Sequence, residues 1–580
     1  IANEYRGYDF NSVTPTSAEF KAAQLPFGGI LYTNDNNQYS YNIQNKLQFS
    51  KAFNPDNRLN ALLGMELRSS TAKGTANKVW GYVPDRGERI VAPTIPSEVI
   101  TPNNPPTGWG ILGDIYSRGW QRTDNTNNFL SFFATFAYSF KNRYVVNANV
   151  RNDASNVFGQ DINHRIDPTY SFGLSWRASE EAFFQKHLKW ITTLNFRGTF
   201  GIQGNALTRE SPELILSQQG VQPGYNRYFS TIGQIPNPYL SWERTRNWNF
   251  GVDLELFRMF YMNLEYYTRR SNAVITVDLP FEYGIDDMKR NGGIIYNRGI
   301  EYTLSFTPIQ KRDFSLNINL NASKNWNKGG ETKIDRNTAM YLRGGSTQIL
   351  KEGYPLSAFW SYSFAGLDGS NGKPMFNYVE VPDEEKSKSI DPTTYLVYSG
   401  ETEPYFTGGL GFSFRYKSLS LNTSFSLLLG SKKRLPSPYS DFQGSGSMMP
   451  DPTKNVNRDL LNRWQKPGDE VYTNIPGLPT WPIEIGWTLP NTDSAESAIE
   501  MWEKSDAMVV SGSFLRCRNI GLSWQMKKEW CDKIHAKNLA INFNMDNIFV
   551  IASKRFNGFD PELENSIMPR SFSLGLNIGF

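Results

Sequence analysis

A strict two-residue repeat of apolar side chains constrains this chain more than any other feature. From Phe572 to Phe580 every second residue is apolar, and the residues between them are small or polar. The same pattern recurs upstream, where Leu130–Phe140 carry one apolar row and Tyr144–Val150 carry the next after a KNR turn. Because successive side chains point to opposite faces of a strand, each run predicts a β-strand with one apolar and one polar face.

The predicted strands are longer than those of soluble sheets. They run for about 10 to 14 residues, whereas strands of globular proteins centre on about 5 to 6. A tilted strand needs about 9 to 11 residues to cross a bilayer, so the lengths favour membrane strands over a soluble sandwich, in which alternation also occurs. The expected pairs are 43–53 with 59–68, 168–178 with 190–203, 248–257 with 260–269, 295–307 with 314–326, 405–416 with 419–430 and 510–526 with 538–549.

Composition agrees with an all-β membrane protein. Hydrophobic residues make up 39% of the chain, yet they form no run of about 18, so no transmembrane helix is encoded. The 14% aromatic content and the 47 glycines suit many strands and many turns. The net charge of +4 comes from 60 basic and 56 acidic residues that are interspersed, which gives no basic face for nucleic acid. We therefore predict a transmembrane antiparallel β-barrel.

Short and long connections alternate along the chain. NPDNR, KNR and PIQKRD are short, whereas the long connections are polar and rich in Trp, Gly and Pro. Outer-membrane barrels have short periplasmic turns and long extracellular loops, so this alternation predicts an outer-membrane protein and gives its orientation. The expected extracellular loops span about 1–40, 69–127, 204–243, 274–294, 327–404, 431–508 and 550–569.

The final strand, 570–580, is expected to run toward the periplasm. Its terminal Phe580 suits the signal by which barrels of this class are assembled in the outer membrane. About 15 strands cannot close as an even-numbered bacterial barrel. A 22-stranded barrel, whose lumen is filled by a plug, would place roughly seven further strands upstream. We therefore expect residues 1–580 to be the C-terminal part of the barrel, starting in an extracellular loop.

Several phrases in the second part of the chain occur on these expected strands and loops. They are NPYLSWERTRNWNFGVDLELF (237–257), NGGIIYNRGIEYTLSF (291–306), RWQKPGDE (463–470), SGSFLRCRNIGLSW (511–524), and DNIF with GFDPE (546–549 and 558–562). In this order they resemble the SusC-like (RagA-like) TonB-dependent transporters of the Bacteroidetes outer membrane. The second phrase carries the family-like spacing on Asn291, Gly293, Asn297, Gly299 and Glu301.

The resemblance implies import of a nutrient oligomer, a glycan ahead of a peptide, across the outer membrane. It also implies a SusD-like surface lipoprotein as a lid, coupling to TonB through a plug, and dimers of the transporter–lipoprotein pair. The family's TonB box, plug and N-terminal extension have no counterpart in residues 1–580. The alternative is a SusC-like barrel that serves as a structural subunit of an outer-membrane assembly or secretion complex, since a fold does not fix a function.

Charged residues on the polar rows are candidates for a hydrated lumen wall. They are Arg151, Asp153, Asp253, Glu255, Glu265, Arg269 and Glu301. Contacts with the wall or a plug are the main expectation for them, ahead of contacts with substrate.

Four tryptophans of the expected loops are candidates for substrate binding, because an aromatic face can stack on the apolar face of a sugar. They are Trp109, Trp360, Trp464 and Trp487. The alternative for each is packing between loops or contact with a lid.

Enzymatic chemistry is not indicated. The sequence has no nucleophile motif, phosphate-binding loop or metal-ligand cluster, so we expect no catalytic residue, cofactor or metal. His164, His187 and His535 are far apart, and Cys517 and Cys531 are too distant along an extended strand to form a disulfide. A soluble adhesin built from stacked sheets remains a second alternative, which detergent-free solubility would support.

Overall fold

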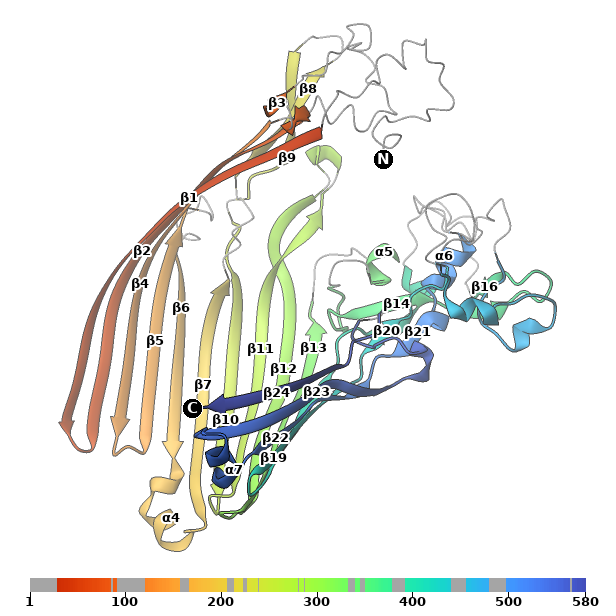
Figure 1. Ribbon diagram of the computed structural model, residues 1–580. Coiled ribbons are helices and arrows are strands. Elements are labelled where there is room, and N and C mark those ends of the chain that lie inside the picture. The colour runs from red at the N-terminus through yellow and green to blue at the C-terminus, as the bar shows by residue number, and fades with distance from the viewer. Residues whose placement is uncertain are drawn as a thin grey trace.

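The computed structural model describes residues 29–580, except 85–86, 91–119, 157–165, 206–212, 223–226, 238, 280, 286, 332–338, 345–349, 378–391, 440–454, 479–496 and 564–565. Its main feature is one curved wall of long antiparallel strands (Figure 1). Along the wall these are β1 (Gly29–Asn54), β2 (Asn57–Val83), β4 (Trp120–Phe140), β5 (Tyr144–Ser155), β6 (Ile166–Arg177), β7 (Ile191–Asn205), β10 (Glu243–Leu256), β11 (Phe260–Asp278), β12 (Asp287–Gln310), β13 (Phe314–Gly329), β18 (Phe406–Tyr416), β19 (Leu419–Leu429), β22 (Phe514–Gln525), β23 (Asn538–Ala552) and β24 (Ser571–Gly579).

Each wall strand pairs with the next wall strand of the chain, so the order in the sheet follows the sequence. The predicted all-β class, the antiparallel pairing and the number of about 15 long strands are confirmed. The short β3 (Arg89–Ile90) adds to the end of β2. Within the described residues β1 and β24 are the two edges of the sheet.

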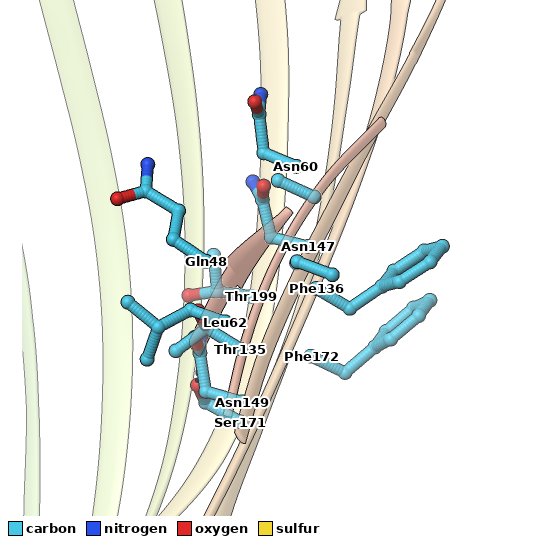
Figure 2. Close-up of a pocket in the computed structure, with 13 residues that line it drawn as sticks. Gln48, Asn60, Leu62, Thr135, Phe136, Asn147, Asn149, Ser171, Phe172 and Thr199 are labelled. Carbon is cyan, nitrogen blue, oxygen red and sulfur yellow. Dashed lines mark hydrogen bonds between the residues drawn. The ribbon is translucent and has the colours of Figure 1, made fainter. Parts of the chain in front are cut away.

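The alternation in sequence becomes two distinct faces of the wall. Figure 2 shows Phe136 and Phe172 on one face, and Gln48, Asn60 and Asn147 on the other. The outward apolar side chains are left largely exposed by the chain itself, which is the arrangement expected of a wall that meets lipid. Between β1 and β24, each strand satisfies its backbone donors and acceptors by pairing with the strands on both sides, as hydrocarbon requires.

Several strands extend beyond the apolar rows. β1 begins at Gly29 and β2 ends at Val83, and β2 pairs with β4 as far as Asn77 opposite Trp120. These residues fall inside the ranges 1–40 and 69–127 that were expected to be loops, and β11 and β12 likewise enter 274–294. Outside the hydrocarbon layer both faces of a strand meet water, so a strand there needs no apolar row, and the alternation that marks a strand in sequence is missing.

The helices are short: α4 (Ala182–His187), α5 (Ala339–Leu342), α6 (Ala498–Glu503) and α7 (Lys528–Lys533). The 3₁₀ turns are η3 (Ala178–Glu180), η4 (Phe281–Tyr283), η5 (Pro392–Thr394), η7 (Arg458–Asn462), η8 (Asp469–Val471), η9 (Asp506–Met508) and η10 (Lys554–Phe556). In the part of the chain that the structure describes, none of the helices has the length and apolarity needed to span a membrane. α4 and α7 lie at the rim of short turns (Figure 1).

Two long connections fold into a compact body at the other rim, which we call the loop cluster. It comprises the described parts of residues 330–405 and 430–513 and contains three small two-stranded sheets. Their strands are β14 (Ala358–Tyr362) with β17 (Leu396–Glu401), β15 (Phe364–Leu367) with β16 (Pro374–Phe376), and β20 (Lys432–Arg434) with β21 (Val509–Ser511). A separate hairpin, β8 (Ile215–Gln222) with β9 (Arg227–Gln234), lies between β7 and β10 in the chain.

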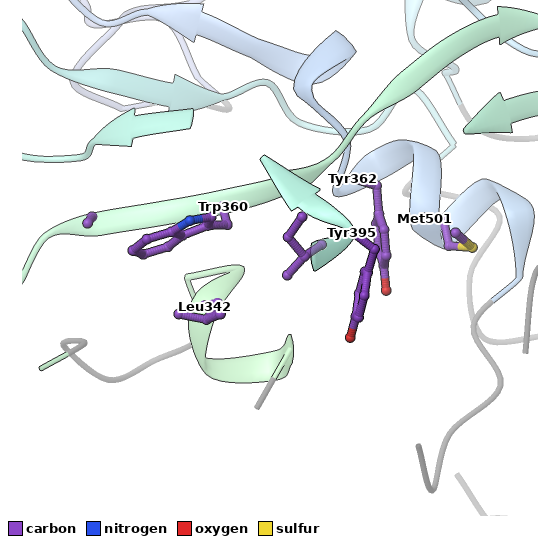
Figure 3. Packing of buried hydrophobic residues seen from close by; sticks show 7 residues of the cluster. Leu342, Trp360, Tyr362, Tyr395 and Met501 are labelled. Atoms are coloured by element: carbon purple, nitrogen blue, oxygen red, sulfur yellow. The ribbon is translucent and has the colours of Figure 1, made fainter. Parts of the chain in front are cut away.

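The loop cluster has hydrophobic cores of the soluble type. One core includes Leu342, Trp360, Tyr362, Tyr395 and Met501, which come from both long connections (Figure 3). A second core joins Tyr439, Leu460, Trp502 and Met508. The two connections therefore form one folded unit on the barrel.

Two of the family-like phrases are joined by hydrogen bonds, although β11 lies between their strands in the sheet. The backbone amide of Ser241 donates to Asn291 Oδ1 at 2.9 Å, and Asn291 Nδ2 donates to the carbonyl of Ser241 at 2.9 Å. Asn237 Nδ2 also donates to the carbonyl of Lys289 at 2.8 Å. These bonds fix the segment before β10 against β12, which gives the two phrases a structural role.

Candidate functional site

The polar face of the wall contains a hollow lined mainly by uncharged groups. The hollow has a volume of about 530 Å³ and lies across β1 to β7. Amide and hydroxyl side chains reach into it (Figure 2). They are Gln48, Asn60, Thr135, Asn147, Asn149, Ser171 and Thr199. Such groups both donate and accept hydrogen bonds, so this surface suits a hydrated, hydroxyl-rich ligand.

Arg151 is the centre of a charged cluster on the same face. Its guanidinium contacts Asp153 at 2.8 Å and Glu66 at 3.2 Å, and donates to Ser131 at 2.8 Å. It also lies over the ring of Phe133, 5.5 Å from the centroid. Both carboxylates are largely shielded, so the positive charge is neutralised within the wall.

Arg197 is the centre of a second cluster, one that the sequence reasoning missed. Its guanidinium contacts Asp253 at 2.6 Å and Glu265 at 2.8 Å, and so joins β7, β10 and β11. To reach Glu265 it crosses Gly251, where an added Cβ would lie 3.0 Å from Nη2. In the sequence, the position of Arg197 on the polar row of its strand could have marked it as a candidate. The structure adds that it lies directly opposite Gly251 on β10.

The remaining wall candidates lie on the polar face around these clusters. Glu255 accepts a hydrogen bond from Thr193 at 2.9 Å. Arg269 lies over the ring of Tyr267, 4.6 Å from the centroid. Glu301 stands opposite Glu265 in the β11–β12 register. The register thus places all seven charged candidates on one face, and brings Asp253 and Glu265 together through Arg197.

Gly299 of the second family-like phrase has a packing reason. Tyr267 lies across it so closely that an added Cβ would meet the tyrosine hydroxyl at 2.6 Å. The hydroxyl then reaches Asn325 Oδ1 at 3.2 Å. The glycine allows an aromatic ring to lie flat on the inner face of the wall.

The four tryptophan candidates for substrate binding differ in where they lie in the structure. Trp109 and Trp487 lie outside the described residues. Trp360 is only 2% exposed, in the core of the loop cluster, and contacts Tyr354 and Tyr398. It has no free face on which a sugar could stack, so the structure favours the packing alternative for this residue.

Trp464 also has a structural role. Its ring packs against Gly372, and its indole N–H donates to Glu470 Oε2 at 3.1 Å. Within the same phrase Asp469 accepts hydrogen bonds from the amides of Gln465 and Lys466 at 3.0 and 3.1 Å. The RWQKPGDE phrase is therefore a turn held by hydrogen bonds between its own residues, and its tryptophan packs against the loop that contains Gly372.

A buried ion pair that the sequence reasoning also missed joins the last loop to the wall. Arg516 Nη2 contacts Asp560 Oδ1 at 2.6 Å, and these side chains are 2% and 4% exposed. Glu562 lies 2.8 Å from the same nitrogen. Arg516 belongs to the SGSFLRCRNIGLSW phrase, and Asp560 and Glu562 belong to the GFDPE phrase, so the two phrases together anchor the last loop to the wall.

Metal-ligating chemistry has no assembled site in the described residues, where no three His, Cys, Asp or Glu side chains come together. Cys517 and Cys531 are buried free thiols. The features that stand out are a polar wall and a packed loop cluster at one of its rims.

Comparison with known proteins gives the family of this chain. The family model "TonB dependent receptor-like, beta-barrel" matches residues 2–427. The chain is 25% identical over 486 residues to the TonB-dependent receptor SusC of Bacteroides thetaiotaomicron, covering 78% of this chain and 44% of that protein. It is 23% identical over 502 residues to TonB-dependent receptor P3 of Formosa agariphila, covering 79% and 46%. The chain thus spans about half the length of these relatives.

Solved structures show the same fold. The structure of the RagAB peptide transporter superposes with a TM-score of 0.71 at 20% identity, covering 95% of this chain and 56% of that chain. A closed state of the RagAB peptide importer gives a TM-score of 0.70. The family is one of outer-membrane transporters rather than enzymes, which agrees with the strands, their two faces and their short turns. This chain belongs to the TonB-dependent receptor family, as a part of its β-barrel in the outer membrane of Gram-negative bacteria.

Proposed function

We propose that the chain is the C-terminal barrel portion of a TonB-dependent importer that takes up a nutrient oligomer. The observation that carries the proposal is the combination of a polar-faced barrel wall with a folded loop cluster at one rim. A polar inner face suits a hydrated passage, and a large structured rim suits capture of a ligand that is bigger than a single sugar or amino acid.

The rim that carries the loop cluster faces the cell exterior, and the rim of short turns faces the periplasm. In this orientation β24 descends, and the exposed Phe580 ends at the periplasmic rim, where it acts as an assembly signal. A complete barrel of 22 strands would pair the edge strands β1 and β24 with further strands of the whole protein. A plug in its lumen would contact the charged residues of the polar face and couple the barrel to TonB.

The cargo is proposed to be a glycan, ahead of a peptide. Seven of the thirteen residues that line the hollow on the wall carry an amide or hydroxyl and none is charged, and the arginines at the centres of the two described clusters are neutralised by adjacent carboxylates. A neutral, hydroxyl-rich oligomer can bond to such a surface without meeting an unpaired charge, whereas peptide termini need charged partners. Trp109, Trp487 and the partly buried Trp464 remain candidates for stacking on sugar rings.

The whole transporter is proposed to work with a SusD-like lipoprotein lid on the loop cluster, and the pairs to form dimers. The test is purification of the native complex from outer membranes in mild detergent, followed by mass spectrometry of its components. A SusD-like lipoprotein with little else supports the importer, and calorimetry with oligosaccharides and with peptides then decides the cargo. Stoichiometric assembly or secretion components, with no ligand bound, would instead make the barrel a scaffold.

A further inference from the structure

The rim of short turns is strongly basic, although the chain as a whole is nearly neutral. Its seven connections are 55–56, 141–143, 178–190, 257–259, 311–313, 417–418 and 526–537. They carry twelve lysines and arginines but six aspartates and glutamates. This excess of six positive charges exceeds the net charge of +4 of the entire chain. We call the basic residues of these connections, together with Lys51, the basic collar.

Three lysines of the basic collar lie beside aromatic residues at the rim. Lys141 Nζ is 5.3 Å from the centre of the Phe140 ring, and Lys417 Nζ is 5.3 Å from that of Tyr416. Phe140 and Tyr416 each end an outward apolar row. The ammonium groups of Lys141 and Lys417 therefore lie at the boundary between the lipid-facing surface and water.

A third pair repeats this arrangement at the edge of the wall. Lys51 Nζ lies 5.2 Å from the centre of the Phe53 ring, and both residues are exposed. The three lysines come from β1, the β4–β5 turn and the β18–β19 turn, so they are spread along the wall. Exposed aromatic residues continue the belt, including Trp190, Phe257 and Trp530. Aromatic side chains at this level mark the headgroup region of a membrane.

We propose that the basic collar binds anionic phospholipids of the leaflet at this rim, holding their phosphates beside the aromatic belt. A lysine can lay its stem on an apolar surface and keep its ammonium at the headgroups. Each basic side chain near an anionic surface contributes about 1 kcal/mol, which is about a fivefold change in binding. Zwitterionic phospholipids have a phosphate but no net charge, so the collar should discriminate against them.

The distribution of charge favours a lipid surface over a protein partner. A protein docks on one patch, whereas the basic collar occupies connections along the whole sheet (Figure 1). The collar is also continuous with the outward apolar rows, which meet lipid acyl chains. The inference rests on the membrane orientation proposed above, with this rim at the inner leaflet.

The test uses the whole protein purified from outer membranes in mild detergent. Mixed micelles supply equal amounts of phosphatidylglycerol and phosphatidylethanolamine with identical acyl chains, and native mass spectrometry measures which lipids are retained. The test variant combines Lys51→Gln, Lys141→Gln and Lys417→Gln. The matched control combines Lys73→Gln, Lys466→Gln and Lys554→Gln, which remove the same charge from exposed positions away from the collar.

We expect the unmodified protein and the control to prefer phosphatidylglycerol at least about fivefold, and the collar variant to lose most of this preference. Equal preference in all three proteins would overturn the inference. Displacement of the lipid by millimolar inorganic phosphate would show a site for free phosphate instead. An acidic protein that copurifies through the collar, without lipid preference, would also overturn it. Retention of no lipid of either kind would contradict the membrane barrel itself, a separate failure.

Discussion

The barrel wall and the loop cluster bury opposite kinds of side chain. On the wall the large apolar residues are exposed, as Leu574 is at 76%, while charged residues such as Asp153 and Asp253 are buried in ion pairs. In the loop cluster Leu342, Trp360 and Met501 are at most 2% exposed. One chain thus contains a wall whose outer face suits lipid and a loop cluster whose surface suits water. The wall depends on its backbone hydrogen bonds and on lipid, and the loop cluster depends on the hydrophobic effect.

The largest effect is expected at Arg516 of β22, which anchors the last loop to the wall. Arg516→Ala leaves the buried carboxylate of Asp560 without its partner, which costs about 3–5 kcal/mol. Hydrogen exchange of residues 553–563 in the intact protein measures the release of the last loop. Arg518→Ala is the matched control, because Arg518 pairs with Glu562 but is 43% exposed, and its loss costs about 1 kcal/mol or less. Equal release in both variants would contradict the buried anchor.

A pair of leucine truncations compares a side chain buried in the loop cluster with one on the lipid-facing side of the wall. Leu342→Ala removes a fully buried side chain and should destabilise the loop cluster by about 2–5 kcal/mol. Leu47→Ala on the outward face leaves no cavity, because lipid fills the space. Limited proteolysis within 350–377 should rise sharply for Leu342→Ala alone. If Leu47→Ala opened the loop cluster equally, the independence of the two regions would be refuted.

Adjacent residues of β2 test the two faces of the wall. Leu63 points outward and is 60% exposed, whereas Leu62 lines the hollow on the polar face (Figure 2). Leu63→Arg should cost about 2–4 kcal/mol in lipid, and Leu62→Arg much less. The measurement is urea unfolding of the protein in liposomes. A larger cost at Leu62 would reverse the assignment of the faces.

The close approach at Gly251 should give a smaller effect. Gly251→Ala forces the Arg197 guanidinium away from Glu265 and weakens a partly exposed ion pair by about 1 kcal/mol. Gly198→Ala is the control, since its added methyl would meet Phe250 at an ordinary 3.7 Å. Both are read from unfolding midpoints. Indistinguishable midpoints would mean that Arg197 does not depend on the space at Gly251.

The smallest expected effect is a pH dependence within the loop cluster. Hydrogen bonds from its own amide, from the Trp464 indole and from the Gly468 amide lower the pKa of Glu470 below 4.5. A lowered folded-state pKa stabilises the fold above the ordinary value, and this stabilisation is lost as pH falls through the folded pKa. Hydrogen exchange of 465–470 should therefore increase below about pH 4.5. The Glu470→Gln variant should lack this step, and an identical step in that variant would contradict the assignment.

The sequence was sufficient to predict the wall. A lipid-facing strand has to show apolar alternation, so Leu130–Phe140 and Phe572–Phe580 carry their faces in the residue order itself. The strand ends could not be read, because residues 69–78 of β2, which continue the strand beyond its apolar row, are small or polar on both faces. Arg197 was missed for a related reason: its partners lie on neighbouring strands, and only the register brings them together.

The loop cluster was not predicted, since its cores join residues far apart in the chain. Trp360 and Met501 meet only after two connections fold together, so Trp360 could be read equally as a ligand-binding or as a packing residue. The family-like phrases marked important positions without giving their roles. Those roles became clear from contacts such as Ser241 with Asn291 and Arg516 with Asp560.

The central claim is that alternate residues of the wall face lipid. The most direct test is a nitroxide scan of residues 59–67 in the whole protein in liposomes, with Cys517 and Cys531 replaced by serine. Collisions with oxygen, which concentrates in lipid, should peak at 59, 61, 63, 65 and 67, and collisions with a water-soluble nickel complex should peak at the positions between them. Oxygen and nickel profiles without a two-residue period, or with the opposite phase, would contradict the account.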